Sequence, residues 1–112
     1  MDPPAWQPFS ITVSTDGENA RVALKGELDM AAADRVDHAL REAENLPVKV
    51  LALDLSELTF VDSSGLAVML RAARRAQDSG RRLVVARPSV YVRKLLQMTA
   101  IDQSLDIVDD VI

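Results

Sequence analysis

The chain has 112 residues, 48% of them hydrophobic and 27% charged, which is typical of one soluble globular domain. It contains no cysteine, so disulfide bonds and thiolate metal sites are excluded. The formal charge of −4 argues against nucleic acid as a partner, and no apolar run is long enough to insert into a membrane.

Residues 1–8 contain three prolines and no basic or strongly apolar segment. This composition predicts an extended lead-in and not a signal peptide. Together with the lack of cysteine, it predicts a cytoplasmic protein. We expect Trp6 to pack loosely against the edge of a single domain formed by residues 9–112.

Residues 9–28 have the pattern of a β-hairpin. Apolar and polar residues alternate from Phe9 to Val13, which is the period of a half-buried strand. Asp16-Gly17 is typical of a hairpin turn, and RVALKGEL at 21–28 predicts the second strand. The side of that strand expected to be buried is formed by Val22, Leu24 and Leu28.

Helices and strands alternate along the rest of the chain. A first helix is predicted between Asp29 and Pro47, and the nearly unbroken apolar run at 48–55 predicts a parallel strand that is covered on both faces. A second helix is predicted at 64–79, with Gly80 as its C-cap residue. The apolar stripes of the two helices are Val36, Ala39, Leu40 and Ala43 in the first, and Leu66, Met69, Leu70, Ala73 and Ala76 in the second.

The last third of the chain continues this alternation. LVVA at 83–86 predicts another buried strand, and Ser89 is placed to cap a short helix. The tail at 104–112 is expected to form either an edge strand or a helical turn. The order predicts an α/β fold: a mixed, mostly parallel sheet of four to five strands, with an N-terminal antiparallel hairpin and helices packed against it. The methionines expected to fill its core are Met30, Met69 and Met98.

Residues 60–67, FVDSSGLA, place two serines between the buried strand and the second helix. As nucleophiles, Ser63 and Ser64 would need a general base. The G-x-S-x-G pattern of a nucleophile elbow is missing, and His38, the one histidine, is expected to face outward from the first helix. We therefore expect no enzymatic activity, no catalytic residue and no cofactor.

Two further interpretations of this segment are that it binds a phosphate group and that it caps the second helix. The P-loop and dinucleotide glycine patterns are absent, and Asp62 would repel a bound phosphate. Either Asp62 or Ser63 is expected to cap the helix. A hydroxyl at the carboxyl end of a buried strand can also be reached by the active site of another protein, and a covalently added phosphate would interact favourably with the helix N-terminus.

Three stretches of the sequence resemble the STAS domain family, and in particular the bacterial anti-anti-sigma factors (anti-sigma-factor antagonists). They are GELD at 26–29, LDLSELTFVDSSGLAVML at 53–70 and VRKLLQMTAID at 92–102. The resemblance is in order and covers about residues 9–108. It differs from the family pattern at Ala67, at Ala31-Ala32-Ala33 and at Gln97, which concerns the choice of partner more than the fold.

The resemblance implies a regulatory binding module with a phosphorylation switch. Such a protein binds an anti-sigma factor that is itself a serine kinase, and so releases a sigma factor. The kinase would phosphorylate Ser63, with Ser64 as second candidate, and a metal-dependent serine phosphatase would reset the switch. The residues expected to contact the partner are Asp29, Asp62, Ser63, Ser64, Gly65 and Leu66. The alternative is a STAS scaffold, or a subunit of a transport or stressosome-like complex, without a phospho-switch.

A basic cluster lies along and just past the second helix. Its members are Arg71, Arg74, Arg75, Arg81 and Arg82. It is interpreted as a solvated helix face, or alternatively as a patch that speeds encounter with an acidic partner.

Overall fold

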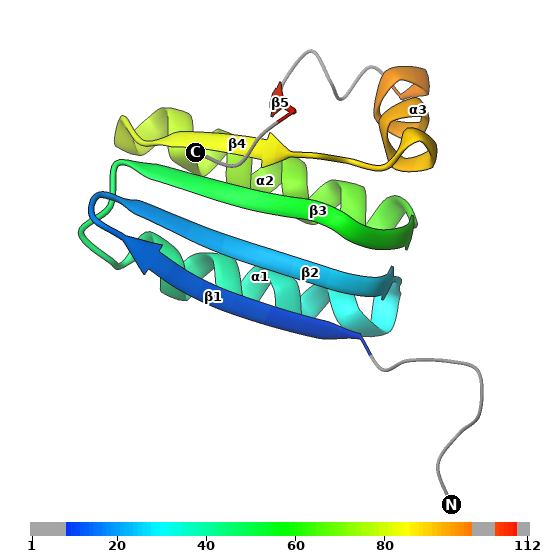
Figure 1. The fold of residues 1–112 in the computed structure, drawn as a ribbon, viewed down its shortest axis with the longest axis horizontal. Coiled ribbons are helices and arrows are strands. Elements are labelled where there is room, and N and C mark those ends of the chain that lie inside the picture. The colour runs from blue at the N-terminus through cyan, green and yellow to red at the C-terminus, as the bar shows by residue number, and fades with distance from the viewer. Residues whose placement is uncertain (1–8, 100–104, 110–112) are drawn as a thin grey trace, which may run out of the picture.

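The computed structural model describes residues 9–99 and 105–109, so the predictions for residues 1–8 and Trp6 lie outside the described residues. One five-stranded sheet has the strand order β1-β2-β3-β4-β5, in which β1 and β2 are antiparallel and the other pairs are parallel (Figure 1). The predicted α/β class and mixed sheet are confirmed. The elements are β1 Ser10–Asp16, β2 Asn19–Leu28, α1 Met30–Glu44, β3 Val50–Val61, α2 Ser63–Ser79, β4 Arg82–Ala86, α3 Val90–Met98 and β5 Asp106–Val108.

The hairpin forms where the sequence predicts it. Asp16 pairs with Asn19, and Gly17 has φ +60°, which a two-residue hairpin turn requires. β1 is more exposed than the predicted half-buried strand, because it is the sheet edge: Val13 is 45% exposed and only Ile11 reaches the core. The tail forms the expected edge strand on the opposite side of the sheet, where β5 pairs with β4.

β3 is longer than predicted. It continues to Val61, six residues beyond the end of the apolar run. The polar residues Ser56, Glu57 and Thr59 hide this extension in the sequence, and two register shifts against β2 add one extra β3 residue each. The extension takes the start of α2 to the same sheet edge as the end of β2.

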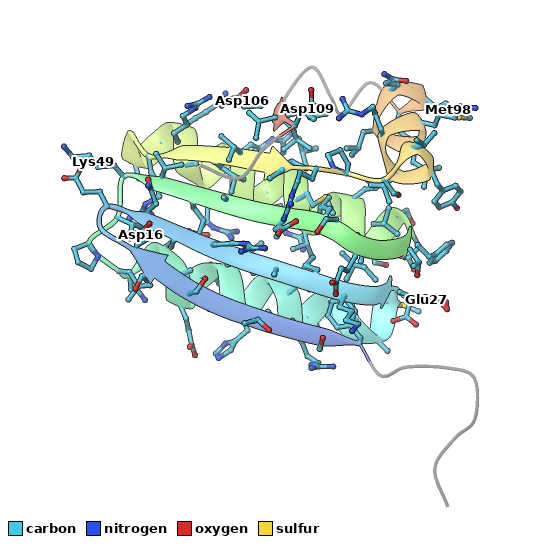
Figure 2. All side chains as sticks on the ribbon, in the orientation of Figure 1. Asp16, Glu27, Lys49, Met98, Asp106 and Asp109 are labelled. Carbon is cyan, nitrogen blue, oxygen red and sulfur yellow. The ribbon has the colours of Figure 1, made fainter. Side chains whose placement is uncertain are left out.

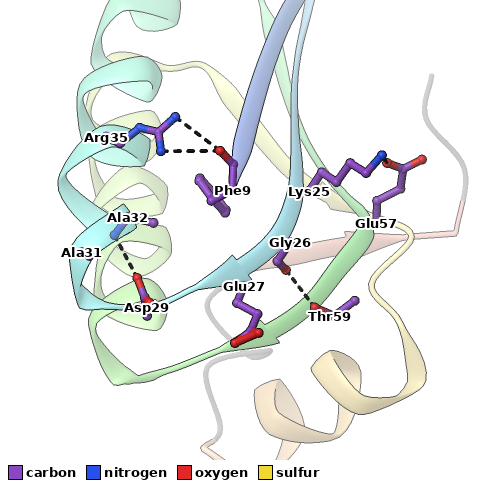
Figure 3. A pocket seen from close by; sticks show the side chains of 10 residues that line it. All are labelled: Phe9, Lys25, Gly26, Glu27, Asp29, Ala31, Ala32, Arg35, Glu57 and Thr59. Carbon is purple, nitrogen blue, oxygen red and sulfur yellow. Dashed lines mark hydrogen bonds and ion pairs between the residues drawn. The ribbon is translucent and has the colours of Figure 1, made fainter. Parts of the chain in front are cut away.

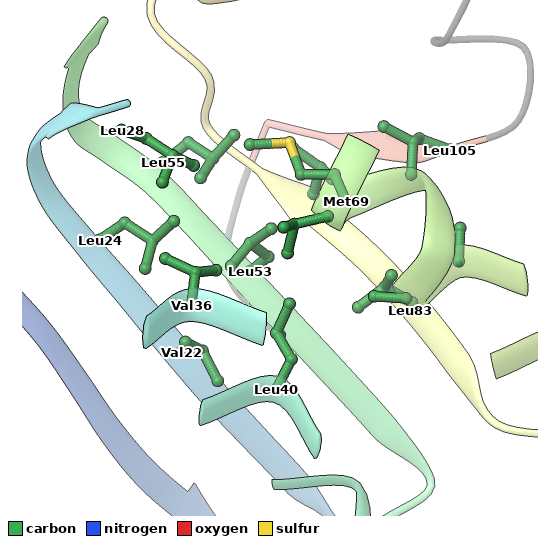
Figure 4. Close-up of a cluster of buried hydrophobic side chains, with 14 of the residues drawn as sticks. Val22, Leu24, Leu28, Val36, Leu40, Leu53, Leu55, Met69, Leu83 and Leu105 are labelled. Carbon is green, nitrogen blue, oxygen red and sulfur yellow. The ribbon is translucent and has the colours of Figure 1, made fainter. Parts of the chain in front are cut away.

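The core lies between one face of the sheet and the pair α1 and α2, which lie side by side on that face (Figure 1). The predicted buried side of β2 is confirmed, since Val22, Leu24 and Leu28 are at most 1% exposed, and Figure 4 shows them facing the helix side chains. Met69 is also fully buried. The expectation for the other two methionines is wrong: both lie at helix ends, where Met30 is 74% and Met98 80% exposed.

Side-chain caps begin all three helices. The carboxylate of Asp29 accepts a hydrogen bond from Ala32 N–H at 3.0 Å, and the Ser89 hydroxyl accepts one from Val92 N–H at 3.2 Å. At the other end of α2, Gly80 is the C-cap residue, as predicted, and adopts the left-handed conformation with φ +71°.

The opposite face of the sheet bears a charged cluster that the sequence did not reveal. Asp54 lies within the apolar run of β3 and is 1% exposed. One of its carboxylate oxygens is shared by Arg21 and Arg87, the latter at 2.9 Å, and the other accepts from Ser56 N–H at 3.0 Å. Burial raises the pKa of Asp54, but the hydrogen bonds from Ser56, Arg21 and Arg87 outweigh it and lower the pKa to about 2. Asp54 is therefore an ionised, paired carboxylate that joins β3 to β2 and to the residue that follows β4.

Candidate functional site

The loops that follow β2 and β3 lie next to each other. Leu28 and Val61, the last residues of these strands, are paired, and Asp62 N–H donates a hydrogen bond to the Leu28 carbonyl at 3.1 Å. Asp29 and Asp62 are therefore in neighbouring loops at one edge of the sheet. Glu27 also lies at this end, away from Asp16 and Lys49 at the other end (Figure 2).

Ser63 is exposed at the first position of α2. The cap is Asp62, whose side chain accepts from Gly65 N–H at 3.1 Å, so the Ser63 hydroxyl is not used for capping. Ser64 is half-buried. A negative charge placed on the Ser63 hydroxyl would stand beside the positive end of the helix dipole, but also beside the Asp62 carboxylate.

Gly65 and Leu66 have a different role in the structure. Both are buried, and Leu66 is 8% exposed. A Cβ atom at Gly65 would lie 2.7 Å from Leu28 Cγ and 2.7 Å from Val61 Cγ2, closer than atoms can pack. The glycine therefore lets the first turn of α2 approach the ends of β2 and β3. Both residues position the serines, and their predicted contact with a partner stays a prediction.

Charges of both signs surround a hollow on the Asp29 side of the loops (Figure 3). Its volume is about 620 Å³, and its acidic residues Glu27, Asp29 and Glu57 face the basic residues Lys25 and Arg35. The Arg35 guanidinium lies 5.5 Å from the centre of the Phe9 ring and donates a hydrogen bond to the backbone carbonyl of Phe9. Lys25 Nζ lies 3.8 Å from a Glu57 oxygen. Of the exposed carboxylates in this hollow, Glu27 and the helix cap Asp29 lie at the end of β2, beside the loop that carries the serines.

Apolar side chains are exposed on the same edge, which the sequence analysis missed. The rings of Phe60, near the end of β3, and Tyr91, in the first turn of α3, stack with centroids 6.5 Å apart. They are 36% and 47% exposed, and Val90 is 77% exposed. A signal was present in Val90-Tyr91-Val92: three consecutive apolar residues on a helix cannot all face the core.

Three of the five arginines in the predicted cluster form hydrogen bonds or ion pairs with other residues of the chain. Arg75 bonds both Glu44 oxygens, which raises its pKa, and lies 3.6 Å from Asp37. The Arg81 guanidinium donates to the carbonyls of Glu44, at the end of α1, and of Val48, and Arg82 pairs with Asp106 at 2.6 Å. The two exposed arginines that remain are Arg71 and Arg74.

The histidine is placed as predicted. His38 is exposed on α1, and its Nε2 lies 2.6 Å from a Glu42 oxygen. It is eight residues, or about 12 Å of helix, from the start of α1, so it is not positioned to activate Ser63. Within residues 9–99 and 105–109, no group of three or more His, Cys, Asp or Glu side chains is placed to hold a metal ion. No helix in the same part of the chain is long and apolar enough to span a membrane.

The fold and the exposed serine at the start of α2 define a STAS-type domain, and comparison with known proteins agrees. The family model described as "Mlab, STAS domain" matches residues 11–109, so the chain belongs to the STAS domain family. Within this family it resembles anti-sigma factor antagonists. It is 32% identical to the anti-sigma F factor antagonist of Paenibacillus polymyxa over 80% of this chain and 77% of that protein. It is 30% identical to the anti-sigma-F factor antagonist RsfB of Mycobacterium tuberculosis, over 87% and 80% of the two chains.

Solved structures show the same fold. The unphosphorylated form of the anti-sigma factor antagonist SpoIIAA has a TM-score of 0.75 and 23% identity, with 90% of each chain covered. The phosphorylated form of SpoIIAA from Bacillus has a TM-score of 0.70 and 22% identity, with 90% of this chain and 93% of that chain covered. Sequence and fold thus group this chain with the anti-sigma factor antagonists, which are regulators.

Proposed function

We propose that this protein is an anti-sigma factor antagonist that binds an anti-sigma serine kinase and is released when the kinase phosphorylates Ser63. The observation that supports it most is the exposure of the Ser63 hydroxyl at the start of α2, in the DSSG sequence of the family. Asp29, Asp62 and Ser64 are the proposed neighbouring contacts. A metal-dependent serine phosphatase in the cytoplasm would restore the unmodified form.

The switch requires only a change of charge. A phosphate on Ser63 adds about −1.5 to −2 charges at neutral pH. Two exposed carboxylates, Glu27 and Asp29, and the half-buried Asp62 already occupy this edge. An interface centred on Ser63 would have to desolvate the phosphate among these carboxylates. A penalty of roughly 3 kcal/mol weakens a complex about a hundredfold, without refolding.

The test uses each anti-sigma factor of the serine-kinase class encoded in the same genome, purified and incubated with this chain and ATP. We expect one of them to phosphorylate Ser63, as located by mass spectrometry. Ser63→Ala should bind that kinase as tightly as the wild type and stay bound in the presence of ATP. Ser64→Ala is the matched control and should still be phosphorylated and released.

The opposite result is equally clear. If none of these kinases binds the chain, or if the modified residue is not Ser63, the proposal is wrong. An unmodified Ser63 in a chain that co-purifies with a transporter or a large scaffold would support the alternative, a STAS subunit without a phospho-switch.

A further inference from the structure

Most of the large apolar side chains that the described part of the chain exposes gather at one edge. These exposed side chains are Val13, Met30, Phe60, Val90, Tyr91 and Met98. Four of them lie near the end of a strand or at the start of a helix: Phe60 is the last residue but one of β3, Met30 begins α1, and Val90 and Tyr91 begin α3. The ends of β2 and β3 and the start of α3 lie at the edge that holds Ser63 (Figure 1), and the stacking of Tyr91 on Phe60 fixes α3 there.

The aromatic pair is the rigid part of this group. Phe60 is fixed by its strand and Tyr91 by the Ser89-capped start of α3, and their rings stack at an interplanar angle of 21°. An exposed ring that is already held in place loses little side-chain entropy when a partner covers it. Tyrosine is also among the residues that dominate interface energies.

The distance to Ser63 links this pair to the proposed switch. Phe60 and Ser63 are three positions apart in the sequence, which is at most about 11 Å of extended chain. A stable interface covers about 800 Å² on each partner, equivalent to a disc of about 16 Å radius. An interface of this size centred on Ser63 reaches Phe60, and Tyr91 lies beside Phe60 through the stacking contact.

We propose that Met30, Phe60, Val90 and Tyr91 form the apolar anchor of the docking surface for the serine kinase that acts on Ser63, with Tyr91 as its main contact. This inference rests on the proposed function. The acidic rim of Glu27 and Asp29 beside the anchor calls for a kinase surface with an apolar recess bordered by basic side chains.

The test is the steady-state phosphorylation of Ser63 by the purified kinase, with Tyr91→Ala as substrate. Tyr91 only docks the kinase and does not touch the transferred phosphoryl group. We therefore expect KM to rise about tenfold while kcat stays within twofold of the wild type. Met98→Ala is the matched control, because Met98 is even more exposed and ends the same helix. It should leave both parameters unchanged.

A second variant separates docking from folding. Tyr91→Phe keeps the ring and its stacking on Phe60, so it should have the KM of the wild type. If Tyr91→Ala does not change KM, or if Met98→Ala raises it equally, the docking surface is wrong although the proposed function stands. If no kinase phosphorylates the wild-type chain, the proposed function fails and the docking surface with it.

Discussion

Protonation of Asp54 should remove a defined part of the stability of this fold. In the folded chain the pKa of this carboxyl is about 2, against an ordinary value of 3.8. Between these values the unfolded chain binds more protons than the folded one, so the free energy of unfolding rises with pH. The contribution of Asp54 is complete above about pH 5 and is lost as the pH falls through 3.8 towards 2.

The size of this contribution follows from the pKa difference. At about 1.4 kcal/mol per unit, the lowered pKa is worth about 2 kcal/mol, and about half of that is lost by pH 3. Asn has nearly the shape of a protonated Asp, so Asp54→Asn should lack the contribution at every pH. Urea unfolding at pH 6 should thus show Asp54→Asn to be about 2 kcal/mol less stable than the wild type, and the gap should halve by pH 3.

A surface ion pair provides the control. Asp106 pairs with Arg82, and both side chains are about half exposed. Exposed pairs contribute less than about 1 kcal/mol, so Asp106→Asn should cost much less than Asp54→Asn. A gap between wild type and Asp54→Asn that stays constant from pH 6 to pH 3 would refute the reasoning, because the lowered pKa would then not be the source of the stability.

The remaining predictions concern the start and the anchoring of α2. Gly65→Ala should destabilise the fold by about 1–3 kcal/mol in urea unfolding, because its Cβ has no room against Leu28 and Val61; an unchanged midpoint would contradict this. Asp62→Ala should cost about 1 kcal/mol through the lost cap, measured by thermal unfolding, whereas Ser63→Ala should cost almost nothing. Arg75→Ala should cost about 1–2 kcal/mol because it leaves Glu44 and Asp37 without their shared partner, and the exposed Arg71→Ala should change stability by less than about 0.5 kcal/mol. Equal losses for the two arginine variants would mean that the tie between α1 and α2 does not stabilise the fold.

The fold was predictable to the extent that it depends on local pattern. The hairpin glycine, most of the two helical stripes and the caps at Ser89 and Gly80 are decided by neighbouring residues, and the structure has them where expected. The end of β3 was missed because a strand that is open on one face continues through polar residues without an apolar run.

Contacts between residues that are distant in the sequence could not be predicted from it. Arg21 and Arg87 each lie 33 residues from Asp54, in opposite directions, and only the parallel register brings the three together. The same holds for the stacking of Phe60 on Tyr91. The solvated-face interpretation of the arginine cluster fits its exposed members Arg71 and Arg74. It did not show that the other three have partners elsewhere in the fold, because a run of like charges does not reveal which members are paired.

The position of Ser63 was predictable because it lies where a strand is followed directly by a helix. An aspartate after the strand, then two serines and a glycine, place a hydroxyl in the first turn of that helix. What the sequence did not show is why the glycine is needed, which is the contact of α2 with Leu28 and Val61.

The most direct measurement is the affinity of the serine kinase for this chain before and after phosphate is placed on Ser63, determined by calorimetric titration with the same kinase preparation. A regulator switched by charge alone predicts affinity about a hundredfold lower for the phosphorylated chain, with identical circular dichroism for both forms. Equal affinities for the two forms would contradict it.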